Sequence, residues 1–508
     1  MSSSTSPTAT AADARTETTR YLCASVHLDE PFCRTVLKEL VDQPFQSVAP
    51  CYGLDVASVS RHAVAARRRR LARDLVLLAA FLWNAVVLST ALSGVDWTVD
   101  PALVDQVLPS FLVSLLISWI VVSVEQGIKF GVLLGRLSRQ NFDPAAVGGP
   151  SSGRVHRRLT YLDALQQGNV VVFAGYQPFA GSGLELGAWS LAIDISKGLR
   201  DPETGARKTP KPFHAVELHD YLRDALRRLG LSGLTATDRL FISGRDAWRD
   251  PRVLPDRFAP PMTSLPDDEL RDRLANQHTR SRTYLCCETT GWRGQLVVTT
   301  FLRAMRLRGS LFLESRSFAL LPLNKWYQRV DLLTGKSAAA RALRPVGCGL
   351  AGALPLLIAS PWRVLRTLAE ISATGRIEAE QRRVISRKEP FDYGAAVSIR
   401  ELATGQLFRR YFQQLDVIMY DTVVQEALLR GITEFLTEHD VDADQVTNLQ
   451  TTINNGNVFH GDVRISGDNN PIVGGKDNSV NQDKEKTPKP PPMDAPPKRP
   501  NLKDWPKG

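Results

Sequence analysis

Two apolar segments decide the fold: LVLLAAFLWNAVVLSTALSGV (residues 75–95) and QVLPSFLVSLLISWIVVSV (residues 106–124). Neither segment contains a charged residue, and as a helix each would be roughly 30 Å long, about the thickness of a bilayer's hydrocarbon core. The loop between them carries acidic residues and no Lys or Arg. The sequence therefore predicts a transmembrane helical hairpin over residues 74–136, with spans at about 75–95 and 106–126.

Basic residues flank the hairpin on its outer ends. Those before the first span are Arg67, Arg68, Arg69, Arg70 and Arg73, and those after the second include Lys129 and Arg136. Lys and Arg stay on the cytoplasmic side of a membrane. We therefore expect a two-span protein of the cell membrane with both termini in the cytoplasm, in contact with the anionic lipids of the inner leaflet.

Glu125 lies at the inner end of the second span, four residues before Lys129. An ion pair at this helical spacing would lower the cost of a charge near the membrane, and this is the interpretation we favour. A proton or ion pathway through Glu125 is the alternative.

A third apolar stretch, Pro345–Trp362, is rich in Gly and Ala and contains three prolines. A full crossing would carry the Arg-rich segment Arg363–Arg387 outside, against the charge rule. We therefore predict a buried or interfacial segment, with a span or re-entrant loop as the alternative.

The remaining chain is ordinary in composition, with 43% hydrophobic and 23% charged residues, so most of it should form a soluble core. Residues 21–73 predict a small cytoplasmic αβ region, with a strand at 21–29, a helix at 30–43 and the basic run. Residues 154–440 predict a cytoplasmic α+β domain with an antiparallel sheet. Its predicted strands are residues 169–175, 188–195, 237–244, 282–290, 295–307 and 310–320, and its predicted helices are residues 219–229 and 415–435.

The loop GYQPFAGSG, residues 175–183, is the best candidate for phosphate binding. Gly175, Gly181 and Gly183 could let a backbone approach a ligand, but the Lys and Ser/Thr that end a P-loop are missing. We favour a plain loop between strands.

Arg245 and Asp246 belong to a cluster of charged residues around Trp248. Such residues can clamp an anion or transfer a proton, although solvated surface pairs are the commoner role. Cys23, His27 and Cys33 do not have a common zinc spacing. The sequence therefore predicts no catalytic set, no cofactor and no metal. The charge of +10 is not accompanied by a nucleic-acid-binding motif, and no nucleic-acid partner is expected.

Both ends of the chain differ from the rest. Residues 1–20 and the Pro/Lys-rich residues 483–508 predict disorder. Residues 441–482 predict an Asn/Gly-rich, β-prone tail, in which Val458, Ile465, Ile472 and Val480 recur at seven or eight residues. Asn/Gly corners between short strands are typical of a β-arc, and a flexible tail is the alternative. The pattern resembles the amyloid-signalling motifs of bacterial and fungal immune proteins.

From Arg61 to about Asn455 the chain resembles a group of uncharacterised actinobacterial two-span membrane proteins. The resemblance rests on RHAVAARRRR, GYQPFAGSG, DRLFISGRD, GWRGQLVVTTFLR and DYGAAVSIRE. It implies the membrane architecture and assigns no catalytic residue.

These patterns predict a non-enzymatic, membrane-anchored scaffold or signalling component, which could form homo-oligomers through the hairpin or the tail. Two alternatives stay open. One is a defence or cell-death effector triggered by assembly of the tail. The other is an enzyme with an unrecognised cytoplasmic site.

Overall fold

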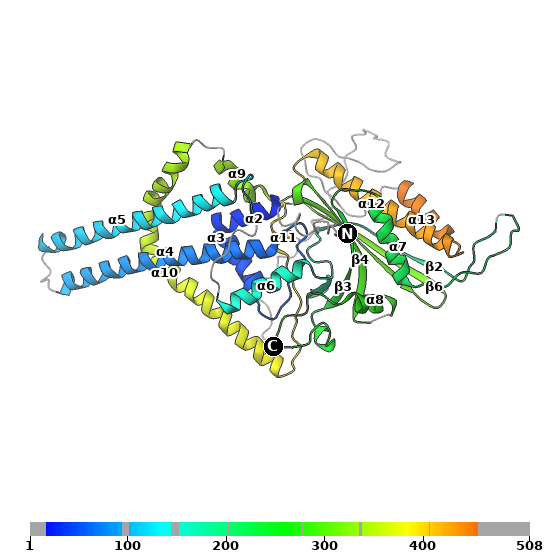
Figure 1. Cartoon of the computed structure of the whole chain (residues 1–508). Coiled ribbons are helices and arrows are strands. Elements are labelled where there is room, and N and C mark those ends of the chain that lie inside the picture. Colours follow the sequence, from blue (N-terminus) through cyan, green and yellow to red (C-terminus); the bar gives the residue numbers. More distant parts are fainter. Residues whose placement is uncertain are drawn as a thin grey trace, which may run out of the picture.

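The computed structural model describes residues 17–93, 101–143, 152–201, 203–276, 279–334, 338–405 and 407–455. Figure 1 shows a twisted sheet with helices packed on it, a cluster of shorter helices beside the sheet, and two long helices that project away from both. The predicted tail residues from 456 onward lie outside the described part.

The sheet has six strands in the order β1-β3-β4-β5-β6-β2. The strands are β1 Val170–Phe173, β2 Leu184–Asp194, β3 Leu234–Ser243, β4 Ser281–Gly291, β5 Leu296–Arg306 and β6 Ser310–Leu320. The four neighbouring pairs from β3 through to β2 are antiparallel, as predicted. β1 instead pairs parallel to β3, so the sheet is mixed and the prediction of an antiparallel sheet is only partly right.

One face of the sheet is covered by α7 (Ala215–Arg228), α12 (Tyr411–Glu438) and α13 (Asp444–Asn455), with the short α8 (Asp267–Ala275) beside them. Leu218 and Leu222 of α7 and Leu428 and Ile432 of α12 are buried against strand residues such as Leu302. α13 occupies the first part of the segment for which the sequence predicts β-prone structure.

A cluster of helices lies between the sheet and the projecting helices. Its members are α2 (Glu17–Leu28), α3 (Glu30–Val36), η1 (Leu37–Val41), α6 (Gly153–Gln166), α9 (Arg329–Thr334) and α11 (Ile399–Leu402). Together with the first turns of α4 (Val56–Ser93), they enclose one apolar core.

The predicted strand at residues 21–29 is wrong, because these residues belong to α2. Tyr21, Leu22, Cys23, Ala24 and Val26 are all buried. A helix that is surrounded on every side shows no apolar stripe, so its sequence lacks the helical period. Asp29 follows the end of α2 and is the N-cap residue of α3. Its side chain accepts a hydrogen bond from the backbone N–H of Phe32 in the first turn of α3.

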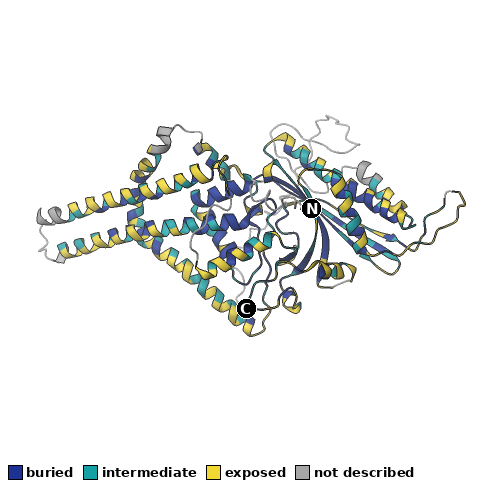
Figure 2. Ribbon diagram, viewed as in Figure 1, coloured by how far each residue is buried: buried dark blue, intermediate teal, exposed yellow. Residues whose placement is uncertain are grey.

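Three helices are long and apolar enough to cross a membrane by length and composition. They are α4, α5 (Pro101–Gly131, continued by η2, Val132–Arg136) and α10 (Ala338–Ser386). The outer parts of α4 and α5 run side by side and expose most of their surface (Figure 2). The sequence predicts two such helices, α4 and α5. The third, α10, contains the apolar stretch Pro345–Trp362, which is not part of the predicted hairpin.

Candidate functional site

Charged side chains gather where the outer parts of α4 and α5 meet the helical cluster. At the centre, Glu125 of α5 accepts a hydrogen bond at Oε1 from Arg69 Nε on α4 at 2.8 Å. Its second oxygen lies 3.6 Å from Arg73 Nη1. The three side chains are between 6% and 12% exposed, so a buried carboxylate joins α4 to α5 through two guanidinium groups. We call the connected ion pairs at the base of the long helices the foot network; its members are Glu30, Arg69, Arg73, Asp74, Glu125 and Arg363.

The foot network continues from α4 to α10 and α3. Arg73 donates from Nε to Asp74 at 2.8 Å, and Asp74 in turn accepts from Arg363 of α10 at 3.2 Å. Arg363 also donates to Glu30 of α3 at 2.8 Å. One chain of alternating charges therefore connects the three long apolar helices to the helical cluster.

At its other end the foot network reaches two buried histidines. His27 Nε2 lies 3.0 Å from Nδ1 of His62, and Arg69 Nη1 lies 3.3 Å from Nδ1 of His27. Burial lowers the pKa of His27 well below its usual value, and the neighbouring His62 and Arg69 lower it further. Arg70 donates to the carbonyls of Val26 and His27 at the end of α2, at 2.9 Å each.

The structure gives Glu125 different partners from the predicted one. The prediction pairs it with Lys129 within α5, whereas its closest charged partners are Arg69 and Arg73 on α4. Lys129 Nζ instead lies 5.1 Å from the ring of Phe130. The i, i+4 spacing rule considers contacts within one helix only. In the folded chain α4 packs against α5 and brings Arg69 and Arg73 to Glu125.

The other predicted membrane-orienting residues lie around the foot network. Arg67 approaches Asp42 at 3.7 Å, Arg68 is exposed on α4, and Arg136 is exposed in η2. All of them lie toward the helical cluster and away from the outer ends of α4 and α5.

The loop of residues 175–183 connects β1 to β2, as predicted, and its contacts are those of a packing element. Phe179 inserts its ring among aromatic side chains of the sheet. Gly181 and Gly183 have φ angles of +95° and +91°, and an added Cβ would lie 2.2 Å from the carbonyl oxygen of Pro50 and 2.4 Å from that of Ala319. Gly175, at φ +72°, faces open space. Gly181 and Gly183 thus let the loop lie against backbone, which explains their presence without a ligand.

Arg245 and Asp246 are not brought together as a pair. Arg245 is 75% exposed and approaches Asp392 at 3.6 Å, while Asp246 approaches Arg249 at 3.7 Å. The tighter contacts nearby belong to Arg273, which binds Asp250 and Glu269. The pair with Asp250 links α8 to the segment after β3, whereas the pair with Glu269 lies within α8.

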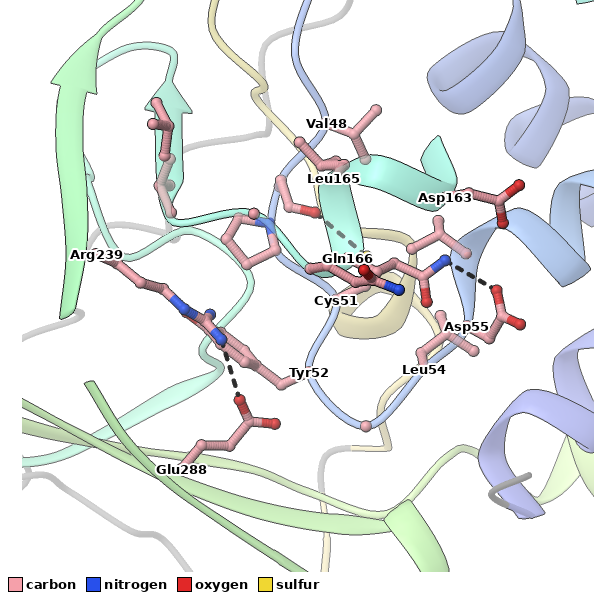
Figure 3. Close-up of a pocket in the computed structure, with 18 of the residues that line it drawn as sticks. Val48, Cys51, Tyr52, Leu54, Asp55, Asp163, Leu165, Gln166, Arg239 and Glu288 are labelled. Carbon is pink, nitrogen blue, oxygen red and sulfur yellow. Dashed lines mark hydrogen bonds and ion pairs between the residues drawn. The ribbon is translucent and has the colours of Figure 1, made fainter. Parts of the chain in front are cut away.

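A cavity of about 460 Å³ opens between the segment Val48–Val56, the end of α6 and the sheet (Figure 3). In Figure 3 the guanidinium group of Arg239 lies over the ring of Tyr52, 5.5 Å from its centroid, and 3.7 Å from Glu288. Burial raises the pKa of Tyr52 above its usual value.

On the other side of this cavity, Gln166 donates to Asp55 at 3.0 Å, and Asp55 accepts from the backbone of Ser58 at 2.9 Å. Asp55 therefore caps the start of α4 and fixes that helix to α6. The pattern Asp-x-x-Ser ahead of a helix is the sequence signal that could have predicted this cap.

Within the described ranges, no three or more His, Cys, Asp or Glu side chains lie where they could hold a metal ion. Cys33, one of the residues tested for zinc spacing, instead points its sulfur at the carbonyl of Ala63 at 3.5 Å.

A family model described as AbeC-like domain matches residues 188–469. The match begins inside β2 and includes α7, β3 to β6, α10, α12 and α13, whereas α4 and α5 precede it. The comparison with curated proteins found no match. The comparison with solved structures found none either.

Proposed function

This chain belongs to the AbeC-like domain family, and we propose that it is a non-enzymatic scaffold or signalling component anchored in a membrane by α4 and α5. In this proposal the two helices form a two-span hairpin in the cell membrane. The α+β domain and both termini lie in the cytoplasm, facing the anionic lipids of the inner leaflet.

The observation that carries the proposal is the surface of the outer parts of α4 and α5. Their exposed apolar side chains include Leu75, Val76, Leu82, Trp83, Val86 and Leu88 on α4, and Leu108, Leu112, Val113, Leu116, Ile120 and Val124 on α5. Monomeric soluble proteins rarely expose a continuous apolar patch of this extent. Acyl chains are the environment that such a surface fits, because the backbone groups between the ends of a helix are already hydrogen-bonded to one another.

The foot network supports a role in transmission or assembly. It links α4, α5 and α10 to α2 and α3 through buried ion pairs, so a shift of one apolar helix would disturb contacts in the soluble core. Lys and Arg at this level also match the headgroup region of an anionic leaflet.

The anchor is tested by separating cell membranes and washing them at alkaline pH, which removes peripheral proteins. We expect the chain to stay with the membrane pellet, and a variant lacking residues 74–136 to leave it or to be degraded. Recovery of the full chain in the wash would overturn the anchor.

The orientation is tested by labelling single cysteines with a membrane-impermeant maleimide in intact cells, in a Cys348→Ser background because Cys348 is exposed. A cysteine in place of Thr98 should react in intact cells, and one in place of Thr8 should react only after lysis. The reverse pattern would overturn the orientation and leave the anchor standing.

The scaffold role is tested on the purified full chain in nanodiscs by native mass spectrometry. A defined homo-oligomer, unchanged by nucleotides or common metabolites, is the expected result. A monomer that turns over one of these metabolites would overturn it in favour of an enzyme.

A further inference from the structure

We propose that α10 lies as a bent wedge in one leaflet of the bilayer, the leaflet on the side of the α+β domain, with its apolar stripe against acyl chains. The inference rests on the proposed membrane anchor, and it assigns lipid as the partner of a helix inside the family-matched region. α10 is long and apolar enough to cross a bilayer. Three observations argue that it enters and leaves on the same side.

First, both ends of α10 are fixed to the soluble part of the protein. Just before its start, Val330 and Leu333 of α9 are buried in the core of the helical cluster. Near its end, Ile385 is buried with Val170 and Leu240 of the sheet. A helix that crosses a bilayer once leaves its two ends on opposite sides, which these contacts exclude for α10 as it stands.

The last turns of α10 make further contacts with the soluble part. Glu378 pairs with Arg154 of α6 at 3.0 Å, and Gln381 donates to Gln43 at 3.1 Å. The end of the helix is therefore fixed by polar contacts as well as by Ile385.

Second, α10 runs past Glu125 toward the outer end of α5 and then turns back, as its contacts with α5 and α4 show. Near its start, Arg344 lies 5.3 Å from the ring of Phe130, on the soluble side of Glu125. In its middle, the carbonyl of Ala353 accepts from Ser118 at 2.7 Å. Ser118 is seven residues beyond Glu125, which is about 10 Å along the helix axis.

Before Ala353, Gly349 lies so close to Ser123 of α5 that an added Cβ would be 2.0 Å from its hydroxyl. After Ala353, α10 returns to the level of the foot network. Ten residues after Ala353, Arg363 pairs with Asp74 beside Arg73 and Glu125. The path therefore descends by roughly two helical turns and rises again, a depth that an interfacial helix reaches in a bilayer.

α10 bends along this path, and Figure 1 shows that it passes obliquely across α4 and α5. Pro345, Pro355 and Pro361 lie inside the helix. Proline removes a backbone hydrogen bond and kinks a helix, so the bend has a local cause in the sequence.

Third, α10 exposes an apolar stripe at helical spacing over about half of its length. Its members are Leu343, Val346, Leu350, Leu354, Ile358, Trp362, Leu365 and Leu368. They recur every three or four residues and therefore lie on one side of the helix. Residues 345–362 include no charge, and Arg363 and Arg366 follow at the level where headgroup phosphates would lie.

The occupant of the stripe follows from its place. It lies beside α4 and α5, at the level of the parts of their exposed apolar surfaces that are nearest the foot network, so the lipid that surrounds those helices reaches it without a gap. Trp362, which is 71% exposed, sits next to Arg363, the arrangement that places indole rings at a membrane interface.

The test uses the full-length chain in vesicles of phosphatidylcholine and phosphatidylglycerol, with one spin label attached at a time through cysteine in the Cys348→Ser background. Labels replace Leu343, Leu350, Ile358 and Leu368 along the stripe. Val86 and Leu116 on α4 and α5 serve as references for the anchor. The depth of each label is measured from its relative collision rates with oxygen and with a water-soluble nickel complex.

The wedge predicts that labels at Leu350 and Ile358 collide mainly with oxygen at a shallow depth, while those at Leu343 and Leu368 are shallower still and share one leaflet. Labels of Leu343 and Leu368 on opposite sides would overturn the wedge in favour of a span. Stripe labels that collide mainly with nickel, while Val86 and Leu116 collide with oxygen, would overturn the wedge alone. Nickel collisions at Val86 and Leu116 as well would overturn the anchor on which the wedge depends.

Discussion

The ring of Phe179 lies 4.5 Å from the ring of Phe301, centroid to centroid, at an angle of 31°. Three more rings, those of Phe241, Tyr284 and Phe318, lie within 5.6 Å of Phe179. A loop residue thus fills the aromatic core on the face of the sheet opposite α7 and α12.

The Phe179→Ala variant should therefore lose about 3–5 kcal/mol of unfolding free energy, because a large buried side chain is removed and a cavity remains. Tyr176→Ala, in the same loop, is the matched control, since Tyr176 is 95% exposed. Chemical denaturation of the purified chain in detergent measures both. Equal stability of the two variants would contradict the packing role of the loop.

Substituting the loop glycines should separate backbone packing from ligand binding. Gly183→Ala places a Cβ against the backbone of Ala319 in a left-handed conformation, and should cost about 3 kcal/mol. Gly175→Ala meets open space and should cost only about 1 kcal/mol, from the left-handed conformation itself. Thermal unfolding measures the order. A larger effect at Gly175 would indicate a role for that exposed turn beyond packing.

Glu125→Gln keeps the shape of the side chain and removes its charge, which leaves Arg69 and Arg73 facing each other in a largely buried site. We expect a loss of about 3 kcal/mol, because breaking a buried ion pair leaves charge uncompensated. Glu426→Gln, at an exposed position on α12, should change stability by less than about 0.5 kcal/mol. Both are measured by denaturation in the same detergent. A Glu125→Gln variant as stable as the control would show that the ion pairs contribute nothing.

His27 should make the protein sensitive to mild acid. Its pKa in the folded chain lies well below the value near 6.5 of an unfolded histidine, so the unfolded state binds more protons in the interval between them. Stability should therefore fall as the pH drops below about 6.5, by at most about 1.4 kcal/mol per pH unit for one proton.

The His27→Gln variant should show a shallower fall in stability between pH 6.5 and 5, whatever its absolute stability. His156→Gln, at an exposed histidine of α6, should keep the slope of the parent chain. Melting temperatures recorded across this pH interval test the comparison. Parallel slopes for all three proteins would place the acid sensitivity elsewhere.

Local sequence patterns are sufficient to predict elements whose structural neighbours are also their neighbours in the chain. The strands that became β4, β5 and β6 follow one another in the chain and in the sheet, so turn residues and β-branched runs were sufficient. β1 was found as a strand, but its parallel partner β3 is not its neighbour in the sequence, and nothing local specifies that pairing. The sequence of α2 reads as a strand because Tyr21, Leu22 and their neighbours are buried on all sides, which hides the helical period.

For the candidate site, the sequence predicts some of the charged residues but not which of them pair. The arginines before α4 and Glu125 were identified, whereas their pairing depends on how α4 packs against α5. Arg363 and Glu30, from distant parts of the chain, could not be added without the fold. The sequence alone also gives no reason to connect Asp55 with Gln166, which lie 111 residues apart in the chain.

The attachment of α10 at both ends has a consequence for proteolysis. The rest of the protein is joined to the three long apolar helices at the start of α4, at the end of α5, and at each end of α10. A protease that cuts one of these connections leaves the others intact, and the fragments stay held together by the shared core. Release of the α+β domain as a free fragment would therefore require several cuts, which makes single-site cleavage an ineffective way to detach it.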